Sequence, residues 1–542
     1  MANINIFALG GQDENGKNTY VIELENDIYV INAGMKVPVN NLYGIDGIIA
    51  DTSYLLNRKD RIKGIFLTHT HDEAFGALPW LLMDLPGVSV YGSVFSIKVA
   101  QERVSKYKIG HNNFSFKVLT KDNKIGSINV KTFELANSIA GSIALNFQTS
   151  DGDIIFTSNF TNADLGVYGK TDLENIRSES NDILALIMDA RRANYHGKSS
   201  EKMNVIPLIE DKFQSAGANQ RIIVGTYDEE MYTISEVLDL AKKYNRPVAL
   251  YGRTFAFLYK MLDIKDQPKF IDFKTINKVD NCVVLVTGTW SRLYQRYERI
   301  ADNKDVFLKF KKNDIIIQIA PPVNGLEVAA TQALDSVAKI APNIIDISDK
   351  DYYPTRPTQD DVEETIRILK PKFFLPIQAL YRYLVVATNG AIKGGLTKNK
   401  TIIMQNGKVV FFKDKEIASQ NGRIKEYGDV LIDGFGVGDI SYSVVRERQM
   451  LSAGGLVTIT SSISRKTKKI VGKNNIQFVG VVSKGEIKVL DELVNATVIQ
   501  KTDEMGKFDL RELQNTIRKR VRKIVLKLVN KEPLVVVTFE LV

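Results

Sequence analysis

The sequence predicts an α/β protein built from several domains, and three observations support this fold class. The chain has 542 residues, more than one hydrophobic core normally serves, so roughly two to four domains are expected. Short apolar runs rich in Val and Ile, which are typical of strands, alternate with helical patterns over most of the chain. Residues 451–542 differ from the rest because they are strongly basic. We therefore expect sheet-and-helix domains followed by a smaller basic module.

The first part of the chain opens with consecutive strands. Residues 4–9, 19–24 and 28–31 are apolar runs, separated by a Gly-Gly pair and by the turn sequence Glu-Asn-Asp. Residues 77–82 predict a helix with Pro79 near its start, where a missing N–H matters least. Residues 153–156 and 183–188 predict further buried strands, each followed by polar residues. The ends of such strands are where α/β proteins usually build their sites.

Residues from about 200 to 350 change to a strand-helix rhythm. Residues 221–225, 247–251, 283–287 and 315–319 predict strands, and residues 229–244 predict one of the helices between them. This pattern predicts an inserted domain with a parallel sheet.

The chain then returns to a mixed pattern before a glycine-rich segment. Thr358 begins a helix-capping sequence whose helix runs to Leu369, and residues 372–376 predict a strand. The glycine-rich residues 433–438 predict a linker before the terminal module.

The terminal module carries most of the excess charge and a clear amphipathic helix. The chain has a net charge of +9, and residues 451–542 hold 17 Lys and Arg against 9 Asp and Glu. Asp509 and Glu512 predict a helix start, after which apolar residues recur at helical spacing: Leu510, Leu513, Ile517, Val521, Ile524 and Leu528. The other side carries Arg511, Arg518, Lys519, Arg520, Arg522, Lys523 and Lys527. This basic face indicates RNA or an acidic protein as partner, or it is simply a solvated surface.

Cysteine content and hydropathy set the expected compartment. The single Cys282 excludes a disulfide framework and a cysteine-rich zinc site, as expected in a reducing cytosol. The sequence opens without a signal-peptide pattern and has no apolar run of about 18 residues. We therefore expect a cytoplasmic protein that does not interact with membranes.

One loop contains a recognisable but incomplete metal motif. A strand ending at Thr68 is followed by His69-Thr70-His71, and this segment resembles the metallo-β-lactamase signature His-x-His-x-Asp-His, which binds two zinc ions. The expected Asp is Glu73, and the expected last His is Ala74, which cannot ligate a metal. The motif therefore keeps its frame but lacks part of its ligand set.

Several motifs spread over nearly the whole chain resemble ribonuclease J. They are residues 9–11 (Leu-Gly-Gly), 14–18 (Glu-Asn-Gly-Lys-Asn), 66–71 (Phe-Leu-Thr-His-Thr-His), 370–376 (Lys-Pro-Lys-Phe-Phe-Leu-Pro) and 433–440 (Asp-Gly-Phe-Gly-Val-Gly-Asp-Ile). The resemblance implies a metallo-β-lactamase αββα sandwich with an inserted β-CASP α/β domain and a small α+β C-terminal domain. It also implies zinc-dependent hydrolysis of RNA, from the 5′ end and internally, in active members.

The resemblance implies the following domain limits. The first part of the metallo-β-lactamase domain spans residues 1–200, the β-CASP domain 201–352, and the second part of the metallo-β-lactamase domain 353–425. Residues 426–450 are the expected linker, and residues 451–542 form the basic C-terminal domain.

The family's remaining ligand positions have mostly changed to amides. By resemblance, the Asp of the family's Asp-Ala-Gly motif is Asn32, and the His of its Thr-His-Ser-Ile motif is Asn137. The bridging Asp of Thr-Gly-Asp-Phe is Asn159, and the last His of Pro-Ile-His-Gly-Glu is Gln378. Amides keep roughly the original shapes but bring no negative charge, so the cleft can stay folded while two-metal hydrolysis is lost.

The number of histidines supports this expectation without an alignment. A site of this type uses five histidines, whereas the chain has four, and His111 and His196 lie in polar loop contexts. Catalytic zinc normally takes three protein ligands and a water. We expect no bound cofactor, or at most weakly bound zinc or manganese at His69, His71 and Glu73; otherwise these histidines serve packing and hydrogen bonding.

Arginines occupy positions where the resemblance leads one to expect other residues. The family's catalytic His of the β-CASP domain aligns with Arg356, while Asp189 is retained at a strand end. Arg356 is expected either to pair with Asp189 at the domain junction or to hold a phosphate. Arg191, Arg192 and Arg292 add further positive charge. Together these arginines either form an RNA-binding cleft without catalysis or are surface residues with no joint role.

The sequence therefore predicts a degenerate ribonuclease J paralogue that takes part in RNA degradation and maturation. We expect a subunit with little or no catalytic activity that binds RNA and assembles with an active ribonuclease J, with a homo-oligomer through the C-terminal domain as a further possibility. The predicted RNA-binding residues are Arg191, Arg192, Arg292, Arg356, Arg518, Lys519, Arg522 and Lys523. The alternatives are a weakly active metal-dependent ribonuclease and an RNA-binding scaffold that needs no nuclease partner.

Overall fold

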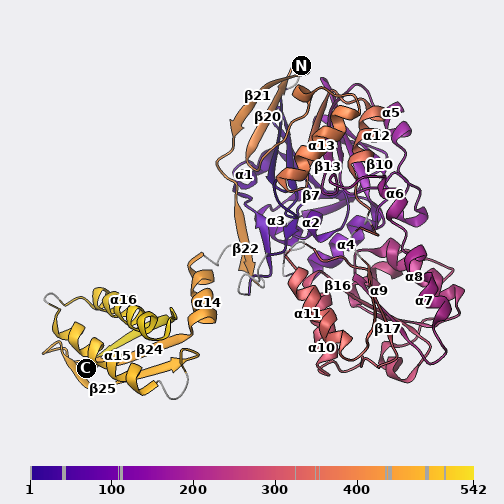
Figure 1. Ribbon diagram of the computed structural model, residues 1–542. Helices are drawn as coiled ribbons and strands as arrows, with labels where there is room; N and C mark the ends of the chain where they lie inside the picture. The colour runs from indigo at the N-terminus through magenta and orange to yellow at the C-terminus, as the bar shows by residue number, and fades with distance from the viewer. Residues whose placement is uncertain are drawn as a thin grey trace. The chain divides into compact units, whose positions relative to one another are not determined.

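The computed structural model describes residues 3–38, 44–107, 109, 114–323, 325–347, 350–352, 355–433, 436–437, 442–482, 487–505 and 508–542. The chain divides into two compact units, and most of the first ends at Leu431 while most of the second begins at Ile432. The first unit holds two stacked sheets and an inserted α/β domain, and the second holds a small sheet with helices (Figure 1).

The first sheet of the larger unit is mixed. Its strands run in the order β21 (Glu416–Arg423), β20 (Lys408–Lys413), β1 (Ile4–Gly10), β2 (Thr19–Leu24), β3 (Asp27–Ile31), β6 (Ile62–Phe66), β7 (Val88–Gly92) and β8 (Phe114–Val118). β1, β2 and β3 pair antiparallel, whereas β3, β6, β7 and β8 pair parallel. The predicted opening strands are therefore confirmed. A short hairpin, β4 (Met35–Lys36) and β5 (Gly47–Ala50), lies between β3 and β6 in the chain.

The second sheet joins segments that lie far apart in the sequence. Its order is β19 (Phe373–Ile377), β13 (Ile183–Asp189), β12 (Gly152–Thr157), β11 (Ile143–Thr149), β10 (Ile128–Glu134) and β9 (Asp122–Ile125). β13 pairs parallel with both β12 and β19, and Asp189 stands opposite Ile377. The segment after the inserted domain thus supplies β19, the edge strand of a sheet whose other strands all precede that domain in the chain.

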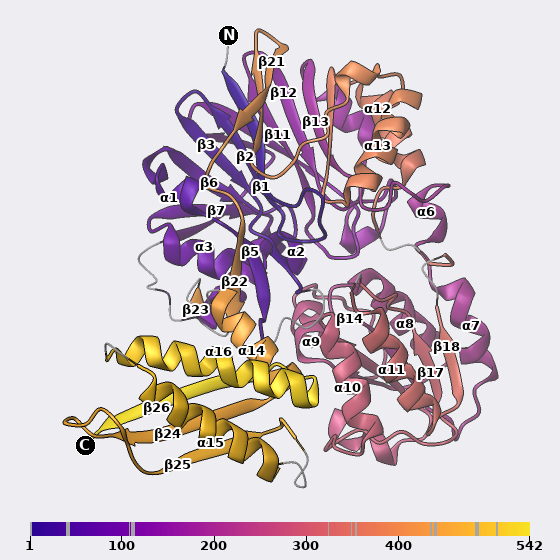
Figure 2. The ribbon, with the colours of Figure 1, turned by 60° about the vertical axis from the view of Figure 1, so that its left-hand side comes forward.

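Apolar side chains fill the space between these two sheets, as shown by the contacts of Phe66 with Phe147 and of Tyr20 with Phe156. The outer face of the first sheet is covered by α1 (Ser53–Leu56), α3 (Leu78–Asp84) and α4 (Val94–Ser105). The outer face of the second is covered by α12 (Gln359–Leu369) and α13 (Tyr381–Lys393), which Figure 2 shows beside β13, and by α5 (Leu173–Ser178). The predicted αββα layering is therefore present.

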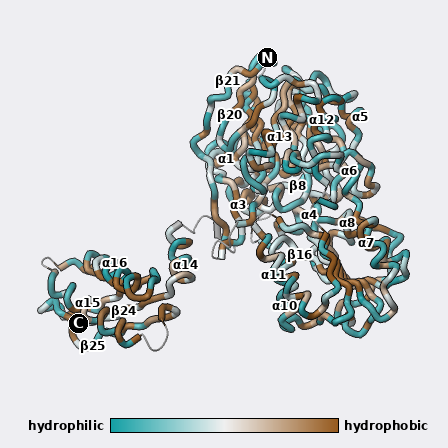
Figure 3. The backbone as a smooth tube through the Cα atoms, viewed as in Figure 1, coloured by the Kyte–Doolittle hydropathy of each residue, from teal (hydrophilic) through white to brown (hydrophobic). Residues whose placement is uncertain are grey.

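The inserted domain has the predicted parallel sheet. Its order is β15 (Val248–Tyr251), β16 (Val283–Gly288), β14 (Ile222–Tyr227), β17 (Ile315–Gln318) and β18 (Asn343–Asp346). Helices α7 (Ile206–Ser215), α8 (Met231–Lys243) and α9 (Arg253–Lys260) cover one face, and α10 (Ser291–Ala301) and α11 (Glu327–Ala338) cover the other. The strands form an apolar centre (Figure 3). The edge strand β18, whose ends are the polar Asn343 and Asp346, was not predicted from the sequence.

Two predicted helix starts are confirmed in detail. Thr358 accepts a hydrogen bond from the backbone N–H of Asp361, whose carboxylate accepts one in return from the backbone of Thr358. In α3, Pro79 lies in the first turn, as expected. These helix starts could be predicted from the sequence because each depends on residues within one helical turn.

The second unit contains a sheet ordered β25 (Ile470–Val479), β24 (Leu456–Ile463) and β26 (Leu534–Leu541), packed against α15 (Ile487–Asp503) and α16 (Leu510–Val529). Residues 426–450, predicted as a linker, include β22 (Asp429–Asp433), β23 (Gly436–Val437) and the first part of α14 (Tyr442–Gly454). Of the glycine-rich residues 433–438, positions 434, 435 and 438 lie outside the described residues. Within the described residues, no helix combines the length and apolar character needed to span a membrane.

Stability should depend on pH through Glu236 in α8, which is 5% exposed and accepts a hydrogen bond from Val205 N–H at 2.9 Å. Burial raises the pKa of Glu236 from 4.5 to about 7. The folded protein therefore holds a proton that the unfolded chain releases, so stability falls as pH rises from 4.5 to 7.

We predict that Glu236→Gln raises the free energy of unfolding at pH 8 by about 1–3 kcal/mol and that its advantage shrinks toward pH 5. Urea unfolding at both pH values would measure this change, with the exposed Glu174→Gln as matched control. An equal effect at both pH values would show that ionisation of Glu236 is not the cause.

Candidate functional site

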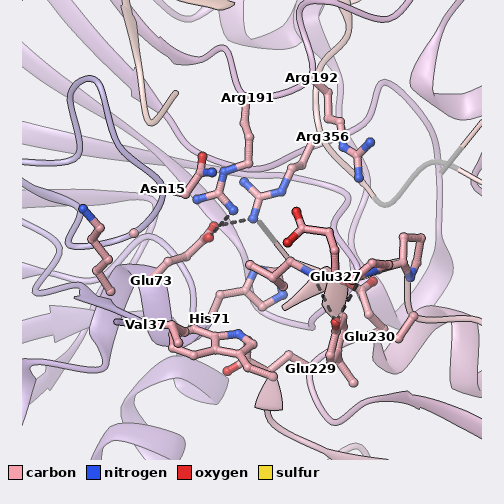
Figure 4. Close-up of a pocket in the computed structure, with 18 of the residues that line it drawn as sticks. Asn15, Val37, His71, Glu73, Arg191, Arg192, Glu229, Glu230, Glu327 and Arg356 are labelled. Atoms are coloured by element: carbon pink, nitrogen blue, oxygen red, sulfur yellow. Dashed lines mark hydrogen bonds and ion pairs between the residues drawn. The ribbon is translucent and has the colours of Figure 1, made fainter. Parts of the chain in front are cut away.

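The candidate site lies in a cavity of about 690 Å³ in the first unit, lined by residues of the sandwich and of the inserted domain. His71 and Glu73 come from the sandwich, and Glu229, Glu230 and Trp290 come from the ends of strands in the inserted sheet. Figure 4 shows Arg191, Arg192 and Arg356 together on one side of this cavity, and Glu229 and Glu230 on another.

The histidine loop follows β6 and leads into α2 (Asp72–Phe75). The rings of His69 and His71 meet edge to face, with centroids 4.8 Å apart. His69 Nδ1 lies 2.9 Å from Thr68 Oγ1, whereas its Nε2 has no hydrogen-bond partner among the described residues. His71 Nδ1 lies 2.9 Å from Asn159 Nδ2, and its Nε2 lies 3.2 Å from Ser138 Oγ. Both nitrogens of His71 are therefore already engaged.

Burial determines the charge of these histidines. It lowers the pKa of His71 to about 4 and holds that of His69 well below its usual value, where the neighbouring His71 lowers it further. Both imidazoles are therefore neutral at pH 7. Since Asn159 donates to Nδ1 of His71, the ring proton of His71 lies on Nε2 and points to Ser138.

The substituted amides form a closed hydrogen-bond network. Asn159 Nδ2 also donates to Glu73 Oε1 at 3.1 Å, and its Oδ1 accepts from Arg356 at 3.0 Å. Asn137 accepts from Thr355 Oγ1 at 2.8 Å and donates to Ser142 Oγ at 3.0 Å. At these two positions the amides pair with imidazole, charged and hydroxyl groups.

The outer amide positions also have partners. Asn32 accepts from the backbone N–H and the hydroxyl of Thr68, at 3.0 Å each. Gln378 donates to Ser158 Oγ at 2.9 Å. Asn32 and Gln378 have left-handed backbones, with φ of 65° and 63°, at the ends of β3 and β19. Ala74 is fully buried and contributes only its backbone, which bonds to His71 and Ala33.

Two carboxylates and two guanidinium groups form an ion-pair cluster, which consists of Glu73, Asp189, Arg191 and Arg356. Arg356 donates to Asp189 at 2.9 Å and also to Glu73 Oε1, while Arg191 lies 2.5 Å from Glu73 Oε2. The backbone N–H of Arg191 donates to Asp189 at 2.7 Å. The predicted pairing of Arg356 with Asp189 is therefore present, and Arg356 reaches a second carboxylate as well.

The cluster is desolvated, so its charges act strongly on one another. Side-chain exposure is 9% for Glu73, 0% for Asp189, 17% for Arg191 and 11% for Arg356. Burial would raise the pKa of Glu73, but Arg191 and Arg356 outweigh it and hold that pKa well below its usual value. For Asp189, burial outweighs Arg356 and raises the pKa. The formal charges of the cluster balance when all four groups are ionised.

The residues around His69, His71 and Glu73 do not fit a divalent cation. One ligand atom from each lies within 4.8 Å of the others, which is close enough for a shared ion. However, guanidinium groups occupy both oxygens of Glu73, and both nitrogens of His71 have partners. Zinc needs about three free protein ligands and gains nothing from adjacent positive charge. No chemical step through a metal follows from this arrangement.

The other predicted site residues are spread over different surroundings. Arg192 lines the cavity, and its guanidinium lies 4.8 Å from the ring centroid of Tyr195. Arg292 is an exposed residue of α10 and is not part of the cavity lining. His196 is exposed in a loop, as expected, and His111 lies outside the described residues.

Glu229 and Glu230, the carboxylates that the inserted domain contributes, were not among the site residues predicted from the sequence. Glu229 accepts from the backbone N–H of Asp72 at 3.0 Å, and Asp72 pairs with Arg103 at 2.6 Å. Burial raises the pKa of both Glu229 and Glu230. Their position directly after β14 was the available signal, because strand ends of a parallel sheet usually carry the site.

The charge of the cavity lining is relevant to any anionic ligand. The acidic lining residues are Asp13, Glu14, Glu73, Glu229, Glu230, Glu327 and Asp346, whereas the basic ones are Lys36, Arg191, Arg192 and Arg356. Two of these arginines belong to the charge-balanced cluster. The cavity as a whole is therefore not a basic groove, and phosphate binding there stays a prediction.

The basic helix of the second unit is α16. The Asp509 carboxylate accepts from the backbone N–H groups of Arg511 and Glu512, which confirms the predicted N-cap. Its buried residues are Leu513, Ile517, Val521 and Val525. Ile524 is half-buried and Leu528 is 49% exposed, so Val525, which the sequence analysis omitted, completes the core stripe in their place. Of the predicted RNA-binding residues here, Lys519 and Lys523 are exposed, and Arg518 and Arg522 are half-buried.

Comparisons with known proteins agree with this architecture. The family model of the ribonuclease J β-CASP domain matches residues 219–337, and that of the ribonuclease J C-terminal domain matches residues 443–540. Ribonuclease J2 of Bacillus subtilis is 28% identical, covering 98% of both chains. Ribonuclease J 2 of Staphylococcus aureus is 26% identical, covering 98% of this chain and 97% of its own. The inserted domain is therefore similar to the ribonuclease J β-CASP domain, and the second unit is similar to the ribonuclease J C-terminal domain.

A solved structure supports the fold alone. A protein of unknown function from Enterococcus faecalis superposes with a TM-score of 0.53 at 14% identity, covering 76% of this chain and 100% of its own.

The ion-pair cluster predicts a large effect of removing one carboxylate. Glu73→Gln leaves two buried guanidinium groups with Asp189 as the remaining carboxylate of the ion-pair cluster, so we expect the free energy of unfolding to fall by about 3–5 kcal/mol. Denaturant unfolding would measure it.

A double-mutant cycle separates this charge effect from packing. The loss in Glu73→Gln/Arg356→Gln should be smaller than the sum of the two single losses, because the double variant removes an anion and a cation together. Strictly additive losses would show that the two residues do not stabilise the fold as a pair.

Proposed function

Because the chain belongs to the ribonuclease J family, we propose that it takes part in RNA degradation and maturation as a subunit with little or no catalytic activity. It binds RNA and assembles with an active ribonuclease J. The support for this role is chemical: the family's fold is retained, while the side chains at its ligand positions no longer form a set that can hold two metal ions.

The observation that carries the proposal is the position of Asn159. By resemblance it replaces a bridging carboxylate, and here its amide donates to both His71 Nδ1 and Glu73 Oε1. An amide N–H pointing at the imidazole nitrogen and at the carboxylate occupies both as acceptors. Two-metal hydrolysis relies on a bridging anion to hold the cations close and to generate hydroxide. Asn159 supplies neither the charge nor the free ligand atoms.

RNA contact is better supported in the C-terminal unit than in the cavity. The exposed Lys519 and Lys523 stand one turn apart on α16, next to the half-buried Arg518 and Arg522, so their charges lie on adjoining faces of one helix. The cavity lining, by contrast, has more carboxylates than basic groups. Polyanion binding depends on uncompensated Lys and Arg, which favours α16 as the main contact.

A second candidate function is slow metal-dependent cleavage. The proximity of ligand atoms from His69, His71 and Glu73, all within 4.8 Å, is the observation that favours it. This function requires that a metal displace both arginines from Glu73.

The two candidate functions predict different metal contents for the purified chain and different rates of RNA decay. We expect the purified chain to hold less than about a tenth of an equivalent of zinc or manganese, and a 5′-monophosphorylated RNA to persist with either ion present. An active ribonuclease J is the positive control. Decay that disappears in His69→Ala/His71→Ala would establish the second candidate function instead.

RNA binding is tested by removing charge from α16. Replacing Arg518, Lys519, Arg522 and Lys523 with Ala should weaken RNA binding and reduce the slope of log K against log salt by about 0.7 for each lost phosphate contact. The matched control removes the same charge from exposed positions elsewhere in the unit: Lys466, Lys469, Lys473 and Lys488. If both variants lose the same affinity, binding follows net charge and α16 is not a specific contact.

Assembly is tested by mixing the chain with an active ribonuclease J and measuring the mass of the complex by light scattering. We expect a mixed oligomer of defined mass. Separate elution of the two proteins at micromolar concentration would contradict the subunit role and leave RNA binding as the function.

A further inference from the structure

We infer that Arg191 and Arg356 take the place of divalent cations as built-in counter-ions, so that the native chain excludes metal from His69, His71 and Glu73 while its strand ends stay joined. This inference does not rest on RNA binding or on a partner. It concerns why this chain cannot be loaded with metal, and it predicts that a metal site can be uncovered by removing the arginines.

The arginine side chains connect elements that lie far apart in the chain. Glu73 belongs to α2, Asp189 ends β13, and Arg356 precedes α12, so that Glu73 and Arg356 are 283 positions apart in the chain. Arg356 contacts both carboxylates of the ion-pair cluster and the side chain of Asn159, which follows β12. A single guanidinium group thus links the ends of several elements, as a shared metal ion would.

The charges of the ion-pair cluster leave no net negative charge for a divalent cation to balance. The two carboxylates of the cluster face two guanidinium groups, and all four side chains are at least four-fifths buried. A divalent cation would have to displace Arg191 or Arg356 from Glu73 and then remain beside a buried positive charge. Guanidinium groups cannot lose their proton in this environment, so they cannot make room by becoming neutral.

Most of the potential ligand atoms already have partners, and Arg191 and Arg356 are the partners of Glu73. Arg191 approaches Glu73 Oε2 at 2.5 Å, and Arg356 donates to Glu73 Oε1. His71 is held at both nitrogens by Asn159 and Ser138. Among the three potential ligands in the described part of the chain, His69 Nε2 is the atom that lacks a hydrogen-bond partner. One free nitrogen is too few for zinc.

The geometry of the potential ligands is nevertheless preserved. Their ligand atoms lie within 4.8 Å of one another, and Thr68 and Ser138 hold the two imidazoles in place. Removing both arginines would leave Glu73 and Asp189 as buried carboxylates without counter-ions. A divalent cation would then offset the charge that the arginines now balance, so binding should be coupled to stability.

The test compares the wild-type chain with Arg191→Gln/Arg356→Gln, which removes both charges but keeps hydrogen-bonding groups. Each protein is equilibrated with Zn²⁺, freed of excess metal by gel filtration and analysed for bound zinc. We expect less than a tenth of an equivalent on the wild-type chain and about one equivalent on the double variant. Adding His69→Ala/His71→Ala to the double variant should abolish the binding.

Thermal unfolding supplies a second readout that needs no activity. The melting temperature of the wild-type chain should be the same in EDTA and in Zn²⁺, whereas the double variant should melt several degrees lower in EDTA and recover in Zn²⁺. Arg367→Gln, an exposed arginine of α12, is the matched control and should behave as wild type.

Two results would overturn the inference. One is a wild-type chain that takes up about one equivalent of zinc and loses it in His69→Ala. The other is a double variant that folds, with an unchanged circular dichroism spectrum, yet binds no zinc. If the double variant does not fold, titration of the folded wild-type chain with Co²⁺ decides, because a visible absorption band that is absent in His69→Ala would show that the arginines do not exclude metal.

Discussion

The structure of the site depends on the electrostatic balance of the ion-pair cluster. Glu73 and Asp189 are buried at the ends of elements that come from distant parts of the chain, and such carboxylates are strongly unfavourable without counter-ions. Arg191 and Arg356 supply these counter-ions. A cleft of this kind can therefore remain folded without metal, provided that the arginines stay paired with the carboxylates.

The amides around the cluster complete this adaptation. Asn159 donates to His71 and Glu73 and accepts from Arg356, so one side chain satisfies three neighbours that differ in charge. Asn137 and Gln378 find partners in nearby hydroxyl groups. Neutral groups of this size fill the space and hydrogen-bond without adding negative charge. These amides thus preserve packing and hydrogen bonding at positions where the resemblance implies metal ligands.

The two units differ in the charge they offer to a partner. In the first unit, acidic residues of the inserted domain face the cavity and the arginines there are largely compensated. In the second, α16 combines a buried apolar stripe with lysines that remain exposed. The second unit therefore has uncompensated positive charge on α16, whereas the positive charge in the cavity of the first unit is largely balanced.

The sequence by itself predicted the first strands of the chain, the parallel strands β14 to β17 and the helix starts at Thr358 and Asp509, because apolar runs and helix caps act over short distances. The layer order and the family's ligand positions came from the resemblance to ribonuclease J. Ala74 has no ligand atom in its side chain wherever it lies, and the amide of Asn159 brings no negative charge to a metal. Only the tertiary structure decided that Arg191 joins Arg356 on Glu73, that Glu229 faces the same cavity, and that Arg292 does not. These facts depend on bringing together residues separated by up to hundreds of positions, and on burial, which local patterns do not encode.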